Sequence, residues 1–235
     1  MSLVRLMAVS SCTGKKSVNV SNPLTLVDLR DPTLKSKRES ELARHVRAAG
    51  DLYMGEQHVR LMRGVNCLRE KYGQAAVSVQ IVSAGYGLVS EHQPLAPYEA
   101  TFKGMGRREA REWAQQLDIP NAVRKAIQGH PLVIFLLGAE YLEAIEPPVH
   151  PEPGQRLLFF APPREVSSLR RPGVTAIPAG REESSLYRAG LVALKGRMFE
   201  LLAYSLLKEG ATLFSDICGD DAPGTVVRAL RKALP

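Results

Sequence analysis

Short apolar runs alternate with amphipathic segments along this chain. Continuous apolar and β-branched runs predict five strands, at 3–9, 77–82, 132–137, 156–161 and 174–178. The last of these is expected at a sheet edge because prolines flank it. Apolar residues at helical spacing predict helices over most of 36–72 and at 107–117, 121–128, 140–145, 186–208 and 225–234. Gly196 is a candidate break within the long helix.

Strands that alternate with helices predict an α/β fold, with a mostly parallel central sheet and helices on both faces. The 235 residues, 45% of them apolar, suffice for one sizeable core, so we expect a single α/β domain over 1–235. Polar, proline-bearing segments at 17–33 and 94–106 predict loops. Four prolines and a glycine within 147–154 predict a rigid connection or, alternatively, a subdomain seam.

Composition narrows the class of protein. No apolar run approaches the roughly 20 residues of a membrane helix, and the apolar start at 1–8 is too short for a signal peptide. We therefore expect a cytoplasmic protein without membrane contact. The three cysteines and five histidines are scattered without metal-ligand spacing, so neither a disulfide framework nor a metal site is expected. We expect no cofactor.

The net charge of +7 favours a polyanionic partner, usually nucleic acid, although good solubility alone would also explain it. Basic residues gather at 35–38, 107–111, 170–171 and 228–232. These clusters are not long tails, so we expect contact with nucleic acid, DNA first, through folded faces and loops. A monomer is favoured.

The segment 83–99 holds the most informative pattern. A strand run ends at Ser83-Ala84-Gly85-Tyr86-Gly87, and Pro97-Tyr98-Glu99 follows. Open α/β sheets bind ligands where their strands end. Glycines there let backbone amides approach a ligand closely, and tyrosine rings can stack on a flat ring. We therefore predict a base-binding site, formed by Tyr53, Ser83, Gly85, Tyr86, Gly87 and Tyr98.

Two carboxylates are candidate catalytic groups for this site. Asp51 could activate a water molecule, although capping the following helix is the commoner use of such an aspartate. Glu99 could stabilise positive charge on a sugar as its base departs, or could simply pair with a nearby arginine. Asp51 is the first choice for the catalytic role and Glu99 the second.

Three segments are candidate phosphate contacts. The turn at 10–16 offers hydroxyls, a glycine and two lysines, but it lacks the first glycine of a nucleotide-binding P-loop. Arg170-Arg171-Pro172-Gly173 faintly resembles a helix-hairpin-helix turn, and Lys195-Gly196-Arg197 opens an apolar helix. An ordinary polar loop or solvated helix face is the alternative in each case. The predicted contacts are Ser10, Cys12, Lys15, Lys16, Arg171, Lys195 and Arg197.

Several of these motifs, in this order, resemble the YaaA peroxide-stress family and related bacterial domains. The turn from Ser83 to Leu88 with Pro97-Tyr98 resembles that family's Ser-Gly-x-Tyr-Gly-Leu turn and Pro-Tyr pair, and Asp51-Leu52-Tyr53 resembles its Asp-x-Tyr segment. Two further segments resemble later motifs of the family more loosely: Gly138-Ala139-Glu140-Tyr141 and Lys195-Gly196-Arg197. The resemblance implies a uracil-DNA-glycosylase-like fold, DNA binding and the handling of a nucleic-acid base.

The leading hypothesis is a DNA glycosylase, a hydrolase that flips and excises a modified or damaged base. By analogy, it could defend a bacterium against phage DNA with hypermodified bases. A non-catalytic DNA-binding protein of the stress response is the alternative. A further alternative is an enzyme that modifies bases of tRNA or free nucleosides, although a free-nucleoside enzyme would not need the basic clusters.

Overall fold

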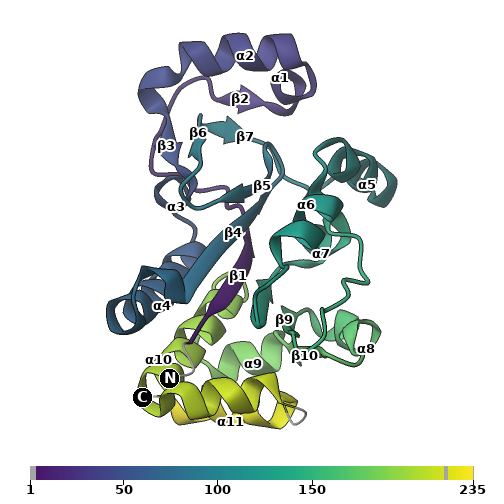
Figure 1. Ribbon diagram of the computed structural model, residues 1–235. Coiled ribbons are helices and arrows are strands. Elements are labelled where there is room, and N and C mark those ends of the chain that lie inside the picture. Colours follow the sequence, from purple (N-terminus) through teal and green to yellow (C-terminus); the bar gives the residue numbers. More distant parts are fainter. Residues whose placement is uncertain (1–3, 220–221, 235) are drawn as a thin grey trace.

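A six-stranded sheet forms the centre of the computed structural model, which describes residues 4–219 and 222–234 (Figure 1). Five strands are parallel, and the edge strand β5 runs antiparallel to β4. The expected α/β class with a mostly parallel sheet and flanking helices is therefore confirmed. In spatial order the strands are β10 (Val174–Pro178), β9 (Arg156–Ala161), β8 (Leu132–Leu136), β1 (Leu6–Ser11), β4 (Val77–Ser83) and β5 (Gly87–Ser90).

The central strands are apolar because both of their faces are covered. Every residue of β8 is buried, as are the first five residues of β1. Phe135 of β8 lies opposite Phe159 of β9, and their rings stack with centroids 4.3 Å apart. A strand buried on both sides needs a continuous apolar run rather than an alternating one, which is the pattern that the sequence carries.

Helices cover the two faces of this sheet (Figure 1). Helices α4, α10 and α11 pack together on one face, and α5 to α8 lie on the other. The bounds of the larger helices are α4 (Glu56–Tyr72), α5 (Arg107–Gln116), α6 (Ile119–Ala126), α10 (Leu194–Cys218) and α11 (Ala222–Lys232). The shorter ones are α3 (Ala49–Leu52), η2 (Gln74–Ala76), α7 (Ala139–Ala144), η3 (Pro163–Glu165), α8 (Val166–Leu169) and α9 (Arg181–Leu186).

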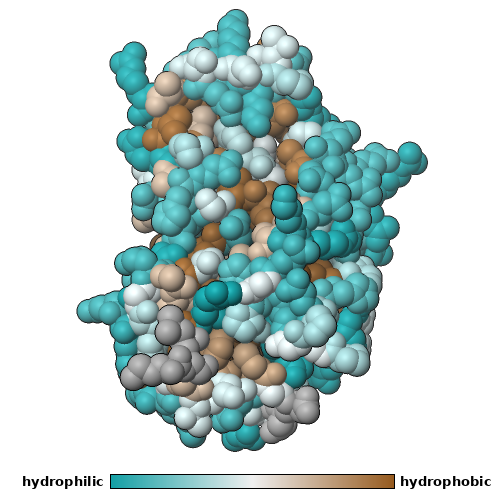
Figure 2. All heavy atoms as spheres, viewed as in Figure 1, coloured by the Kyte–Doolittle hydropathy of each residue, from teal (hydrophilic) through white to brown (hydrophobic). Residues whose placement is uncertain are grey.

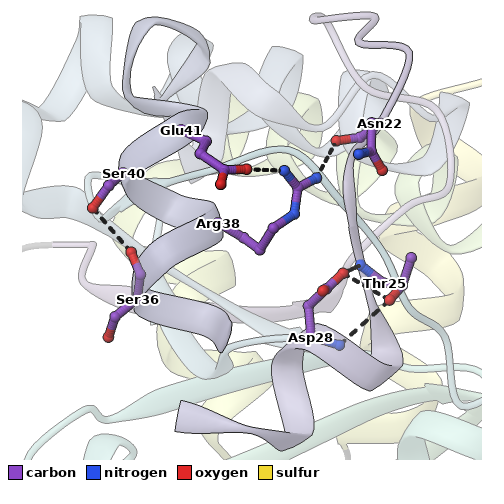
Figure 3. Close-up of polar contacts among 7 residues, drawn as sticks. All are labelled: Asn22, Thr25, Asp28, Ser36, Arg38, Ser40 and Glu41. Atoms are coloured by element: carbon purple, nitrogen blue, oxygen red, sulfur yellow. Dashed lines mark hydrogen bonds and ion pairs between the residues drawn. The ribbon is translucent and has the colours of Figure 1, made fainter. Parts of the chain in front are cut away.

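A small cap stands beyond the carboxyl ends of β1 and β4. It contains α1 (Leu26–Arg30), α2 (Pro32–Glu41), η1 (Ala43–His45) and two short pairings, β2 (Leu24–Thr25) with β7 (Tyr98–Glu99) and β3 (Arg47–Ala48) with β6 (Pro94–Leu95). Thr25 and Asp28 form a capping box that starts α1, and Arg38 joins the Asn22 carbonyl to Glu41 (Figure 3). These contacts join the start of α1, helix α2 and the segment before β2 within the cap.

The structure confirms all five predicted strands to within a few residues, although residue 3 lies outside the described residues. Strand β10 is at the sheet edge, as expected from its prolines. The prediction of a loop over 17–33 is wrong in part, because β2, α1 and the start of α2 fall within it. Asp31 caps α2 and Pro32 occupies its first turn, a favourable pair at a helix start.

The long helix begins at Leu194 rather than at residue 186, and Gly196 does not break it. Its kink lies at Gly210, which has a positive φ of 64°. Gly196 is needed for packing instead, since a Cβ there would overlap the backbone carbonyl of Gln57 in α4. Close contact between α4 and α10 therefore depends on this glycine. In the described part of the chain, no helix is both long and apolar enough for a bilayer.

Gly196→Ala should lower the free energy of unfolding by about 1–3 kcal/mol, because backbone cannot yield as a flexible side chain would. This is a net loss: the overlap costs more than the ~1 kcal/mol by which alanine's higher helix propensity stabilises the helix. Urea unfolding measures the change. Gly190→Ala is the control, since its methyl group meets no atom within 4 Å. Equal stability of the Gly196 variant and the native protein would contradict the packing role.

Candidate functional site

The strand order reverses between β1 and β8, and open α/β sheets bind ligands outside the carboxyl ends of strands at such a point. Here Gln57 fills that crevice. Its side-chain amide donates to the Ser10 hydroxyl (3.2 Å) and to the Leu136 carbonyl (3.0 Å). Gln57 and Ser10 are both buried, and the open space lies elsewhere along the same edge, in cavities lined by residues that follow β1, β8 and β9.

Buried hydroxyls line up beside this space. The Ser83 hydroxyl oxygen, at the end of β4, accepts bonds from the amides of Gly85 (3.2 Å) and Tyr86 (3.1 Å). It also lies 2.7 Å from the Tyr98 hydroxyl, which lies 2.8 Å from the Tyr53 hydroxyl. Because the Ser83 oxygen already accepts two bonds, its own proton suits the bond to Tyr98, whereas either phenol can be the donor in the bond between Tyr98 and Tyr53. We name Tyr53, Ser83 and Tyr98 the hydroxyl chain.

Burial sets the protonation of the hydroxyl chain. Desolvation raises the pKa of Tyr53 and of Tyr98 far above the ordinary tyrosine value, so both phenols are neutral donors. Both rings have 0% exposure. Tyr98, one of the two rings predicted to stack on a base, therefore presents no free face to a ligand in this structure, whereas the other, Tyr86, is half-buried.

The glycines of the turn accommodate protein packing. A Cβ at Gly85 would come within 2.7 Å of the Tyr98 ring, and Gly87 has a positive φ of 76° with the Leu117 carbonyl nearby. Tyr86 is half-buried, and the Lys35 ammonium lies 4.7 Å above its ring. Burial and, secondarily, Glu39 raise the pKa of Tyr86. The turn thus closes onto the cap, and its amides bond to Ser83.

Cys12 and Lys16 follow β1 and lie beside the hydroxyl chain. The Cys12 thiol is 3.1 Å from the hydroxyl of Tyr141, a residue of α7 that the site prediction missed. The Lys16 ammonium donates to the carbonyls of Thr13 (3.2 Å) and Gly14 (3.5 Å) and lies 4.4 Å from the centre of the Tyr98 ring. Burial lowers the pKa of Lys16, while Cys12 and Glu99 oppose part of this shift.

Lys16 and Glu99 border the same two cavities. One, of about 260 Å³, continues along Val18 to Pro23, and the other, of about 590 Å³, continues along 100–105. A third, of about 390 Å³, shares Met105 with the second and reaches Arg107 and Arg164. Together they extend along the carboxyl edge of the sheet. Figure 2 shows a mostly hydrophilic face, with apolar residues visible in a band over the region of β4 and β5.

The structure brings nine of the predicted site residues together: Cys12, Lys16, Tyr53, Ser83, Gly85, Tyr86, Gly87, Tyr98 and Glu99. Asp51 lies elsewhere, exposed in α3, and lines neither cavity that Lys16 and Glu99 border. This placement favours Glu99 over Asp51 as the carboxylate of the site. Lys15 is exposed next to Lys16 and lines none of these cavities.

Three predicted phosphate contacts lie away from these cavities. Arg171 precedes β10, the outer strand at the far end of the sheet from β5. It donates to the carbonyls of Ser168 and Leu169. Arg197 pairs with Glu200 at 2.9 Å. Lys195 is only 9% exposed, and burial lowers its pKa although Glu140 is nearby. The partners of Arg171 and Arg197 lie within three residues in the chain, whereas the burial of Lys195 near Glu140 depends on distant segments, which the sequence alone could not reveal.

Fold and site together define an α/β protein with ligand-sized cavities at the carboxyl edge of its sheet. Residues 35–156 match the family of unknown function DUF6884. The match spans more than half of the chain, so the protein belongs to this family. It includes Tyr53, Ser83, Tyr98, Glu99 and Tyr141 but begins after Lys16. No curated protein matches the chain.

Tyr98→Phe should lower the free energy of unfolding by about 1–3 kcal/mol, because it leaves the buried Tyr53 hydroxyl without its partner. Tyr204→Phe is the matched control. Its hydroxyl bonds Glu200 at 3.2 Å but is less buried, so a loss below about 1 kcal/mol is expected. Chemical denaturation measures both values. Equal losses for the two variants would mean that the hydroxyl chain has no special structural role.

Proposed function

We propose that this protein binds DNA along the carboxyl edge of its sheet and releases a modified or damaged base from it, as an N-glycosylase. One observation carries the proposal: the Glu99 carboxylate and the Lys16 ammonium border the same cavities, beside neutral, buried hydroxyls. A carboxylate and a cation at one cavity match a substrate that develops positive charge on a sugar and carries negative charge on its phosphates.

The chemistry follows from these charges. When a base departs, positive charge develops at C1′ of the sugar, and a nearby carboxylate stabilises it or activates the attacking water. Glu99 takes this role, because it is exposed and lies at the cavity. The cations along the cavities hold the phosphate backbone. These cations are Lys16, Lys103, Arg107 and Arg164.

The proposal includes a uracil-DNA-glycosylase-like fold and a kinship with YaaA. The turn at Ser83 to Leu88 and the Pro97-Tyr98 pair support this kinship, together with the parallel sheet. Hypermodified phage bases are the substrate class to test first, which would make the protein an agent of phage defence. Such a base must leave the duplex before it can enter a cavity of the protein.

A separate observation favours a second function, which is DNA binding without catalysis. The rings of Tyr53 and Tyr98 are fully buried, so they offer no stacking surface to a flipped base. A protein that only binds phosphates needs no such surface. The two functions differ in product, since only the glycosylase leaves an abasic site.

The test is incubation of the purified protein with genomic DNAs, unmodified or carrying hypermodified phage bases. Mass spectrometry detects a released base, and alkaline cleavage detects abasic sites. Glu99→Gln should slow base release by about 10²-fold or more, because it removes the charge that stabilises the sugar cation. Asp51→Asn is the matched control and should release base at close to the native rate, since Asp51 lies outside the cavities.

Binding of the same DNAs, followed by fluorescence anisotropy, separates the two functions. Binding that weakens steeply with salt but yields no free base from any DNA would favour the non-catalytic protein. Base release that stops in Asp51→Asn and continues in Glu99→Gln would restore Asp51 as the catalytic carboxylate.

A further inference from the structure

We propose that Lys16 is the nucleophile of a second step, in which its amine forms an imine with the aldehyde of an abasic sugar and the DNA strand is then cut. This inference rests on the proposed function, because the abasic sugar is the product of base release. It adds a strand-cleaving lyase activity and assigns Lys16 a covalent role in place of phosphate binding alone.

The position of Lys16 carries the inference. Its segment is fixed by backbone pairing, since Ser17 bonds the Leu52 carbonyl (2.8 Å) and Met54 bonds the Lys15 carbonyl (2.9 Å). The side chain borders both cavities that Glu99 borders. Its ammonium contacts two backbone carbonyls and the face of Tyr98. A lysine held at a cavity in this way is presented to a ligand there.

The surroundings also suit a nucleophilic amine. Only the neutral amine attacks a carbonyl, and partial burial favours it, since desolvation lowers the pKa of Lys16. The arginines of the neighbouring cavity are paired, Arg107 with Glu143 (3.0 Å) and Arg164 with Glu165 (3.1 Å), and an arginine stays protonated in any case. Of the two adjacent lysines, Lys15 is exposed and Lys16 is enclosed.

The step balances without an oxidant or a metal. The Lys16 amine attacks C1′ of the open-chain sugar, a C–N bond forms, and the aldehyde oxygen leaves as water. The protonated imine makes the C2′ proton acidic, and Glu99 removes that proton. The electron pair forms a C2′=C3′ double bond, and the C3′–O bond breaks, which releases the downstream strand with its 5′-phosphate. Water then hydrolyses the imine and restores the free amine.

The experiment uses the full chain and a duplex oligonucleotide with one preformed abasic site, together with sodium borohydride. Borohydride reduces the imine to a stable amine, so the protein becomes covalently joined to DNA and migrates slowly on a denaturing gel. Lys16→Arg keeps the positive charge but cannot form the imine, and the yield of adduct should fall by about tenfold or more. Lys125→Arg is the control and should retain the native yield, because Lys125 is exposed on α6 and lines none of the three cavities.

Peptide mass spectrometry of the trapped native protein identifies the attached lysine without any variant, so a poorly folded Lys16→Arg protein does not obscure the result. An adduct on Lys16 supports the inference. An adduct on another lysine, or no adduct, overturns it. Because the abasic site is preformed, this result is independent of base release: a protein that releases base but forms no adduct is a glycosylase without lyase activity.

Discussion

The hydroxyl of Tyr98 is the contact on which the carboxyl edge of this molecule depends. It joins the end of β4, through Ser83, to the segment after α3, through Tyr53. A buried hydroxyl without a partner costs free energy, so the three groups satisfy one another and fix three distant segments at once. The Tyr98 ring fills the space that a side chain at Gly85 would need. The Tyr98 hydroxyl is therefore one of the contacts that seat the cap on the sheet, together with Lys35 on the Tyr86 ring and Arg30 on the Trp113 ring.

This packing also determines where a ligand can bind. Gln57 fills the crevice between β1 and β8, and Tyr98 fills the space above the glycine turn. Lys16 and Glu99 border two of the remaining cavities, and the third lies between Met105, Arg107 and Arg164. The buried, neutral phenols of Tyr53 and Tyr98 lie beside Lys16 and Glu99 and lower the local dielectric constant. Electrostatic interactions are stronger there than in water. In the proposed chemistry, the charges of Lys16 and Glu99 act beside the neutral phenols of Tyr53 and Tyr98.

Much of the fold could be predicted because the parallel strands are buried on both faces and so read as continuous apolar runs. The strands at 156–161 and 174–178 were predicted at their observed bounds. Strand β5 was missed because it has only four residues and alternates buried with half-buried positions. The start of α10 was placed too early, since the apolar Leu186 and Leu191 resemble a helix face but are exposed in the structure. Local pattern cannot tell an exposed apolar residue from a buried one.

For the site, the sequence by itself determined which strand ends share an edge of the sheet. Cys12 and Ser83 follow parallel strands, so they had to lie at one edge of the sheet. The tertiary structure alone decided the distances and the burial: it placed Glu99 rather than Asp51 at the cavities, buried Tyr53 and Tyr98, and added Tyr141 beside Cys12. The physical reason is that parallel strands place their carboxyl ends at one edge of the sheet, whereas strand order, exposure and pairing depend on residues brought together from far along the chain.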